Sequence, residues 1–434
     1  MDETWQARLR RLGVQKGARH LKSPSPRPFS PPAQPDSPDD ISFRPPTSDE
    51  ADDPPRLTEL LPGGQVVETA VGACFVVDRV YPLSYRHGSE QLGDLLGQLP
   101  ATLAPFLRDE RLRALRFEQC LFLDTETTGL AGAGVLAFMV GVAFFDAQSV
   151  VVRQFFLRDH GDEAAMLTLL DELLAARPAL VTFNGRSFDL PLLDGRYLMN
   201  RMPGDLLERP HLDLLLPARR LWRLRLGSCA LSSLEQTLLD VTRTHEDVPG
   251  WAIPGLYQAY LRSGDARELL RVFYHNQIDM LSMVTLATRM LRLLGQQEAE
   301  AHPVDLVSLG RWQSDLGMLA EAEQALRLAA AADLPLDVYR QALTWLGLLL
   351  KRQARRDEAL PIWQQLAATS YDSIDAHVEL AMHHEWQTQD LAAARRWTEA
   401  ALTLVAGWPS AQAEAVRPAL LHRLQRLQRK QAGA

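Results

Sequence analysis

The chain is poor in cysteine and has no long apolar segment. Its 434 residues include only three cysteines, Cys74, Cys120 and Cys229, which lie far apart in apolar surroundings. Cysteines placed in this way form neither a disulfide framework nor a C-x-x-C metal site, so we expect reduced core residues. No run of about 18 or more apolar residues occurs, and no apolar segment follows the first basic residues. We therefore expect no membrane span, no signal peptide, no membrane partner and a cytoplasmic location.

Lysine is also scarce. Four lysines stand beside 42 arginines, so a cluster of arginines is weak support for a nucleic-acid interface in this chain. The net charge of −8 disfavours a protein that coats nucleic acid. A nuclease stays open, because an acidic site holds metal while a local basic rim holds phosphate.

Composition divides the chain into four segments. Eleven of the 27 prolines lie within the first 55 residues, and this bias predicts a disordered tail over 1–57. Two β-rich runs separated by glycines predict a β-hairpin lead-in over 58–100. Strands and helices mix over 101–296, whereas 303–434 has no strand-like run.

The segment 101–296 is expected to hold a mixed sheet. The strands are predicted at residues 118–124, 135–145, 150–157 and 179–183. A short link makes the second and third of these strands antiparallel. Because a helix over 163–176 separates them from the fourth strand and further helices follow, we expect an α/β sheet flanked by helices.

The C-terminal segment repeats itself, with steps of 37 and 34 residues between the leucines that begin the aligned stretches. These leucines are Leu309, Leu346 and Leu380, and the small residues that keep register after them are Ala322, Ala359 and Ala393. A period near 34 residues with a small residue in the second helix resembles the tetratricopeptide repeats. The resemblance implies a C-terminal all-α tetratricopeptide-like repeat domain over 303–434 that docks a protein partner or guides substrate. An irregular helical bundle is the other interpretation.

The most informative stretch is Leu121-Phe-Leu-Asp-Thr-Glu-Thr-Thr-Gly-Leu130, in which an apolar run leads into two acids. In a strand, side chains at i and i+2 point to the same face, so Asp124 and Glu126 are expected to lie side by side. Like charges at that distance repel, and Mg²⁺ binds carboxylate oxygens while it keeps positions open for phosphate. The pair predicts a divalent-metal site. A loop with two solvated acids is the alternative.

Two later stretches supply further acids. Over 180–191 a buried strand ends in Asn-Gly, and Asp189 follows at the start of a helix. Over 273–286 the apolar spacing is helical and places His275 and Asp279 one turn apart on one face. Each acid alone also has a structural explanation, as a helix-end residue or as part of a surface His/Asp pair.

Together the three stretches resemble the motifs of the DEDD exonucleases of the ribonuclease H-like fold, and more closely the YprB-like ribonuclease H-like family. The matching stretches are 123–130, 182–191, 211–214 and His275-Asn-x-x-Asp279. The resemblance covers roughly 115–295 and implies an α/β ribonuclease H-like mixed sheet flanked by helices. It also implies a nucleic-acid substrate, DNA or RNA, and two Mg²⁺ or Mn²⁺ ions.

The resemblance implies roles residue by residue. The implied metal ligands are Asp124, Glu126, Asp189 and Asp279, with His275 as the catalytic general base. The candidate substrate contacts are Thr127, Asn184, Arg186 and Phe188. The implied function is a metal-dependent nuclease, most simply a 3′–5′ exonuclease. The alternative is a catalytically weak nucleic-acid-binding or scaffold protein that works through its helical repeats.

One departure from the family concerns the general base. DEDD enzymes place a His five residues before the last Asp or a Tyr four residues before it. Here Tyr274 is five residues and His275 four residues before Asp279. We favour His275 because it shares the helical face of Asp279, and Tyr274 stays open.

Other residues receive lesser roles. Asp213 is expected to orient the fold rather than to bind metal. The arginines around Trp222 can hold phosphates and stack a base, or they form a solvated helical face; they are Arg219, Arg220, Arg223 and Arg225. The loop 247–251 is expected to shape the substrate cleft without chemistry of its own.

Overall fold

The computed structural model describes residues 55–129, 134–295 and 301–432. The predicted disordered tail lies outside these ranges except for its last three residues. A short helix, α2 (Leu57–Leu60), opens the described chain. Among the described residues, no helix combines the length and the apolar character that crossing a membrane requires.

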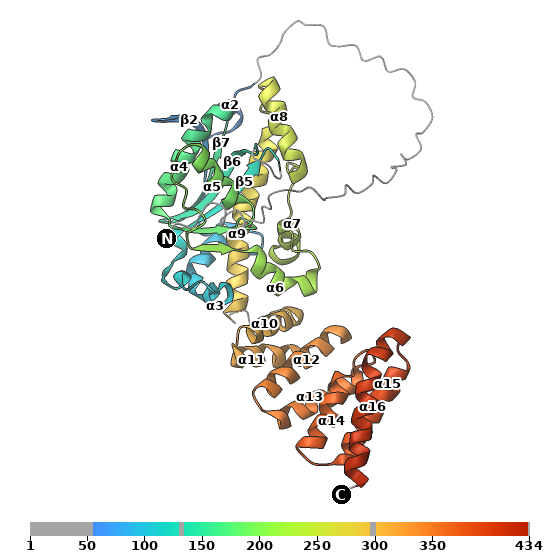
Figure 1. The fold of residues 1–434 in the computed structure, drawn as a ribbon. Coiled ribbons are helices and arrows are strands. Elements are labelled where there is room, and N and C mark those ends of the chain that lie inside the picture. The colour runs from blue at the N-terminus through green and yellow to red at the C-terminus, as the bar shows by residue number, and fades with distance from the viewer. Residues whose placement is uncertain (1–54, 130–133, 296–300, 433–434) are drawn as a thin grey trace, which may run out of the picture. The chain divides into compact units, whose positions relative to one another are not determined.

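Seven strands form one sheet, in the order β1-β2-β7-β6-β5-β8-β9. They are β1 (Gly64–Thr69), β2 (Gly72–Pro82), β5 (Cys120–Thr127), β6 (Ala137–Asp146), β7 (Ser149–Phe156), β8 (Ala179–Thr182) and β9 (His211–Asp213). The pairs from β1 to β5 are antiparallel, while β5, β8 and β9 are parallel. The predicted mixed sheet is therefore confirmed (Figure 1).

Two features of the sheet go beyond the prediction. The hairpin of β1 and β2 extends the main sheet, because β2 pairs along most of its length with β7. Strand β9 has three residues and lacks β-branched side chains, so its sequence carries no strand signal. Parallel pairing with β8 forms it. Two more short strands, β3 (Arg86–His87) and β4 (Glu90–Gln91), pair with each other outside the sheet.

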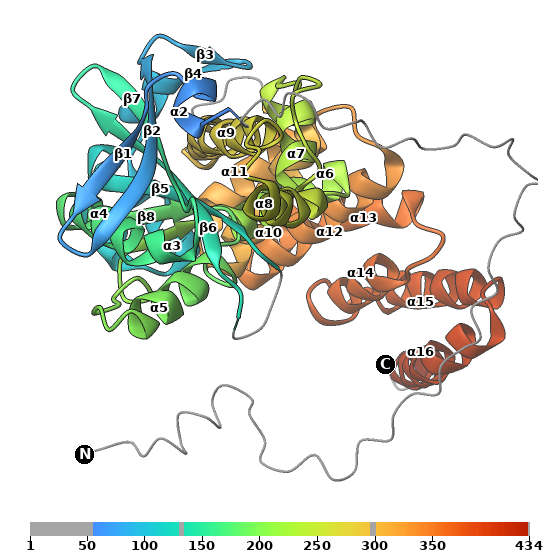
Figure 2. The same ribbon diagram turned by 90° about the horizontal axis from the view of Figure 1, so that it is seen from above.

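Helices cover both faces of the sheet (Figures 1 and 2). They are α3 (Ala104–Leu107), α4 (Glu163–Ala176), α5 (Asp189–Met199), α6 (Leu215–Leu226), α7 (Leu231–Leu234), α8 (Ile253–Ser263) and α9 (Leu269–Leu294). Leu123 of β5 packs in one core with α4 and α5, whereas Phe122 packs in the other core with α6 and the second half of α9. Since side chains alternate along a strand, Asp124 shares the face of Phe122 and projects toward α9.

The remainder of the described chain is helical. Its elements are α10 (Pro303–Asp315), α11 (Leu319–Ala330), α12 (Leu336–Arg352), α13 (Arg356–Thr369), α14 (Asp375–Trp386), α15 (Leu391–Ala406) and α16 (Ser410–Ala432). Successive helices pack as pairs through glycine. A Cβ on Gly310 would lie 2.7 Å from a side-chain atom of Leu326, and one on Gly347 would lie 2.7 Å from Trp363. Such close approach has no room for a larger side chain.

The three cysteines are buried and unpaired, as predicted. Burial raises the pKa of the Cys74 and Cys120 thiols to about 12. Since the thiolate is the reactive form, these cysteines are packing residues rather than nucleophiles.

Candidate metal centre

The β5 strand carries the first two acids to the face covered by α9. Glu126 is buried and Asp124 half-buried, and a register irregularity with β6 follows Glu126. Strand β8 pairs with Cys120–Phe122 and β6 pairs with β5 from Phe122 to Thr127, so the backbone at the acids is held by β6. The pair therefore projects from a rigid element, as the strand pattern predicted.

The α9 helix brings His275 and Asp279 to the same place. Nε2 of His275 lies 3.4 Å from Oδ2 of Asp279, one helical turn away. One potential ligand atom from each of Glu126, His275 and Asp279 lies within 4.8 Å of the others. The structure thus groups an acid of β5 with the His/Asp pair of α9, two elements about 150 residues apart in the chain.

Asp189 approaches β5 from another side. It is the first residue of α5, and its carboxylate accepts a hydrogen bond from the hydroxyl of Thr125, which projects to the face opposite Asp124. Asp189 is therefore not one of the three grouped residues. Its charge still acts on Asp124 and Glu126, because it contributes to the pKa of both carboxyls.

Asn276 holds Asp124 in place, a role that its match to the family motif did not predict. The fully buried amide donates to Oδ2 of Asp124 at 3.2 Å and accepts from Nε2 of Gln154 at 3.0 Å. On β6, a Cβ at Gly141 would lie 1.9 Å from Oδ1 of Asn276. Gly141 thus leaves space for the amide of Asn276, which connects Gln154 of β7 to Asp124 of β5. An Asn on a buried helical face opposite a mid-strand Gly is the signal that marks it.

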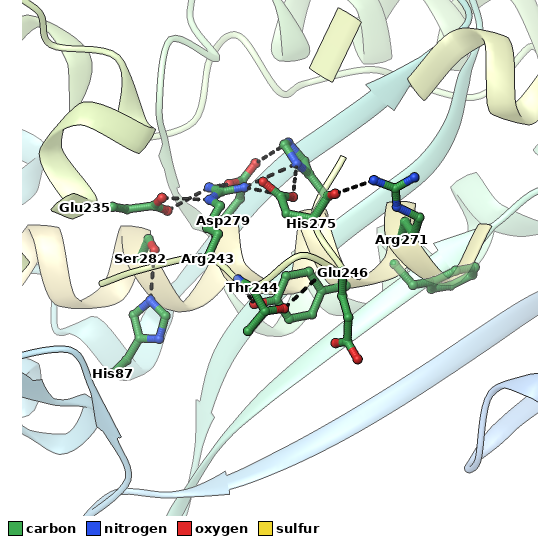
Figure 3. A network of polar contacts seen from close by, with 12 residues as sticks. His87, Glu235, Arg243, Thr244, Glu246, Arg271, His275, Asp279 and Ser282 are labelled. Carbon is green, nitrogen blue, oxygen red and sulfur yellow. Dashed lines mark hydrogen bonds and ion pairs between the residues drawn. The ribbon is translucent and has the colours of Figure 1, made fainter. Parts of the chain in front are cut away.

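Arg243 is the residue that the sequence analysis missed (Figure 3). It lies in the loop after the short π-turn 235–239. Its guanidinium donates two hydrogen bonds of 2.7 Å to the buried carboxylate of Glu235 and a further one to Asp279. Burial alone would lower the pKa of Arg243, but the bonds to Glu235 and the charge of Asp279 raise it overall. The metal centre therefore has a permanent cation on one flank.

Asp247, in the loop 247–251, contacts the imidazole of His275, which the sequence did not predict. Its Oδ1 lies 2.8 Å from Nδ1 of His275, and Arg271 donates to its backbone carbonyl at 2.7 Å. Nδ1 of His275 also lies 3.2 Å from the guanidinium of Arg243, and its Nε2 lies 3.4 Å from Oδ2 of Asp279, so charged neighbours face both ring nitrogens. The loop thus helps to fix the orientation of the imidazole.

The acids oppose one another's ionisation. Burial, followed by the charges of Asp189, Asp279 and Glu126, raises the pKa of Asp124 well above its ordinary value. Burial and the charges of Asp279 and Asp189 do the same for Glu126. Burial raises the pKa of Asp279 too, against the charges of His275 and Arg243. A divalent cation relieves this repulsion, and carboxylate oxygens are the donors that Mg²⁺ and Mn²⁺ prefer.

The pKa of Asp189 gives a stability prediction. Burial raises it from 3.8 to about 6, so the free energy that the neutral acid contributes is present below pH 3.8 and lost as the pH rises through about 6. Asp189→Asn stays neutral and keeps an acceptor for Thr125. We measure the free energy of unfolding by urea in the presence of a chelator. Relative to the wild type, the variant is expected to become more stable by up to about 3 kcal/mol between acid pH and pH 8.

The matched control for this prediction is Asp171→Asn, on the exposed face of α4, which is expected to show no pH-dependent gain. Saturating Mn²⁺ at pH 8 is expected to make the wild type more stable than Asp189→Asn, because a ligand of the native state stabilises the wild type by mass action. An equal difference between Asp189→Asn and the wild type at both pH values would contradict the raised pKa.

Asp124 and Asp279 open onto a cleft of about 560 Å³, called here the acidic cleft. Arg219 and Arg223 of α6 also line this cleft, together with Asn184. The predicted arginine cluster thus splits, because Arg225 turns away and binds Asp305. Trp222 is only 1% exposed, so the expectation that it stacks a base is wrong.

Of the four predicted substrate contacts, only Asn184 lines the acidic cleft. Asn184 is exposed with a positive φ of 74°, and Arg186 lines a neighbouring hollow of about 570 Å³. Thr127 is buried and donates to the carbonyl of Gly129 at 2.8 Å, and Phe188 is half-buried at the start of α5.

Asp213 holds the loop that carries Asn184 and Arg186. Its carboxylate accepts backbone hydrogen bonds from Asn184 at 2.9 Å, Arg186 at 3.0 Å and Leu215 at 3.0 Å. The carboxylate is therefore occupied in positioning the loop between β8 and α5, the orienting role expected of it.

Comparison with known proteins agrees with this geometry. A family model described as the RNase H superfamily matches residues 121–291, from β5 to near the end of α9. The chain is 31% identical over 340 residues to the uncharacterized protein YprB of Bacillus subtilis (strain 168), which covers 76% of this chain and 80% of that protein. Membership of this superfamily indicates nuclease-type activity on nucleic acid. Members of the superfamily generally use divalent metals. This chain therefore belongs to the RNase H superfamily and, within it, to the YprB-like family.

Proposed function

We propose that this protein is a metal-dependent nuclease that hydrolyses phosphodiester bonds by a two-metal mechanism, as a 3′–5′ exonuclease on DNA or RNA. The observation that carries the proposal is the grouping of Glu126 of β5 with His275 and Asp279 of α9, beside Asp124, where the charges of Asp189 and Asp279 raise the pKa of both β5 acids. The helical segment 303–434 is proposed to dock substrate or a protein partner, in the manner of tetratricopeptide repeats.

The donor set fits hard divalent cations. Asp124, Glu126 and Asp279 offer carboxylate oxygens on one face of β5 and α9, and Asp189 adds negative charge from the side of α5. Bound Mg²⁺ or Mn²⁺ supplies a Lewis acid for phosphate oxygens and a hydroxide nucleophile near neutral pH. Asn276 fixes the rotamer of Asp124, so the carboxylate is oriented before an ion binds.

His275 is proposed to take the proton from the attacking water through Nε2. Asp247 at Nδ1 orients the ring and stabilises the imidazolium that results. Tyr274 is engaged elsewhere, because its hydroxyl accepts the backbone N–H of Thr244 at 3.2 Å. This contact favours His275 as the base.

Arg243 supports the second candidate, a catalytically weak nucleic-acid-binding or scaffold protein. Its guanidinium already gives Asp279 a positive partner without any metal. Calorimetric titration with Mn²⁺ separates the two candidates. Saturable binding that is lost in Asp279→Asn supports the nuclease, and its absence from the wild type leaves only the second candidate.

The proposal is tested with purified protein on labelled single- and double-stranded DNA and RNA. With Mg²⁺ or Mn²⁺ we expect a 5′-labelled strand to shorten stepwise and to release nucleoside 5′-monophosphates. A 3′-labelled strand is expected to lose its label at once, and a chelator is expected to stop both reactions. No cleavage of any substrate would refute the proposal, and shortening from the 5′ end would refute its polarity.

A further inference from the structure

A second groove, of about 420 Å³, adjoins the acidic cleft. Arg219 and Arg223 of α6 line both hollows, so the two meet across this pair of side chains. The other side of the second groove is lined by Arg311 of α10 and Trp345 of α12. We call it the arginine groove. It leads from the acids of the metal centre onto the first helices of the C-terminal segment.

The walls of the arginine groove are held together. Arg225 of α6 binds the buried carboxylate of Asp305 through two hydrogen bonds, of 2.8 Å and 2.7 Å. The ring of Phe106 packs against Trp312 of α10, with ring centroids 4.7 Å apart. The ion pair thus fixes α6 against α10, the aromatic contact fixes α10 against α3, and the groove is preformed.

The lining of the groove is strongly basic. It includes four arginines and no acid; they are Arg219, Arg220, Arg223 and Arg311. Arg220 lies 3.6 Å from Asp315. Within the described residues, the exposed side chains of Arg219 and Arg223 form no hydrogen bond or ion pair. Exposed guanidinium groups without a carboxylate partner are suited to phosphate.

The far end of the groove adds a flat surface. The guanidinium of Arg311 lies over the ring of Trp345, 4.8 Å from its centroid, and the ring is half-buried. Aromatic rings with stacked arginines bind unpaired bases of any sequence, because every base has a π face. Bases within a duplex are already stacked on one another and present only their edges.

We propose that the arginine groove holds a single strand of nucleic acid whose end lies in the acidic cleft. Arg219 and Arg223 bind successive phosphates, and Arg311 with Trp345 stacks a base farther along the strand. The inference rests on the proposed nuclease function and deepens it. It assigns single-stranded nucleic acid as the substrate class and the first helices of the C-terminal segment as part of its binding site.

The test measures binding of fluorescein-labelled single strands of increasing length in a chelator, where no cleavage occurs. We expect Trp345→Ala to weaken binding roughly 5- to 150-fold for strands long enough to reach the ring, with the loss growing with length. The double variant Arg219→Gln with Arg223→Gln is expected to weaken the salt dependence of binding. The slope of log affinity against log salt concentration becomes less negative by about 1.4. Trp345→Phe keeps a ring and is expected to retain most of the affinity, which separates stacking from folding.

The chain offers a matched control in Tyr371. The guanidinium of Arg340 lies over its ring, 4.7 Å from the centroid, but neither residue lines the arginine groove. Tyr371→Ala is expected to bind strands of every length as the wild type does. Equal affinity of Trp345→Ala and Tyr371→Ala at every length would overturn the inference and leave the groove to a protein partner. Length-dependent binding without cleavage by the wild type would instead overturn the nuclease proposal alone.

Discussion

Asp124→Asn is expected to lower kcat for metal-dependent cleavage by about 10³-fold. Metal ions contribute several kcal/mol of charge stabilisation to the transition state, and losing about 4 kcal/mol of it corresponds to this factor. The substitution removes the charge while it keeps an oxygen that accepts from Asn276. Steady-state kinetics with Mn²⁺ on a labelled single strand measures the loss.

The fold is not expected to suffer in this variant. The pKa of Asp124 is raised, so its ionised form opposes folding at neutral pH, and the amide removes that repulsion. Without metal, Asp124→Asn should therefore melt no lower than the wild type. Asp146→Asn, an exposed acid at the end of β6, is the matched control and is expected to keep full activity. Activity unchanged in Asp124→Asn would remove Asp124 from the reaction.

Local sequence was sufficient to predict the elements that carry the acids. The strand before Asp124 is a continuous apolar run because both of its faces are buried, and the helix around Asp279 has apolar residues at helical spacing. The i, i+2 and i, i+4 spacings then follow from strand and helix geometry. The order of the strands in the sheet does not follow from such periods, and β9 has too few residues to show one.

The residues that surround the acids were beyond local pattern. Arg243 and Asp247 lie in an irregular loop, and only the tertiary fold places them against α9. Asn276 has the polarity of a surface residue, yet it is buried, because Gly141 leaves room for it on β6. The periodicity of apolar residues along a helix predicts that such a polar residue is exposed. Asp247, Asn276 and Arg243 convert a group of acids into a site with an oriented imidazole, a held Asp124 carboxylate and a compensating cation.

His275→Gln is expected to lower kcat by about 10²- to 10⁴-fold, the range for loss of a general base. The carboxylate of Asp247 orients the imidazole through Nδ1, and Nε2 lies 3.4 Å from Oδ2 of Asp279, at the candidate metal centre. Tyr274→Phe is the matched comparison, because it removes only a hydroxyl that accepts from a backbone N–H, and we expect a change of a few-fold at most. Asp247→Asn should fall between them, at roughly 10- to 100-fold, since it disturbs the orientation of the ring without removing it.

The affinity of the His275→Gln variant for Mn²⁺ shows whether His275 is a metal ligand or a general base that does not bind the metal. His275 lies close enough to Glu126 and Asp279 to share an ion with them, so its loss from a coordination shell would weaken Mn²⁺ binding as well as turnover. A general base that is not a ligand would lower kcat and leave the calorimetric affinity for Mn²⁺ within a few-fold. We expect the second result, because the bond from Nδ1 to Asp247 prepares Nε2 to accept a proton as the water attacks. A larger loss of kcat in Tyr274→Phe than in His275→Gln would transfer the role of general base to the tyrosine.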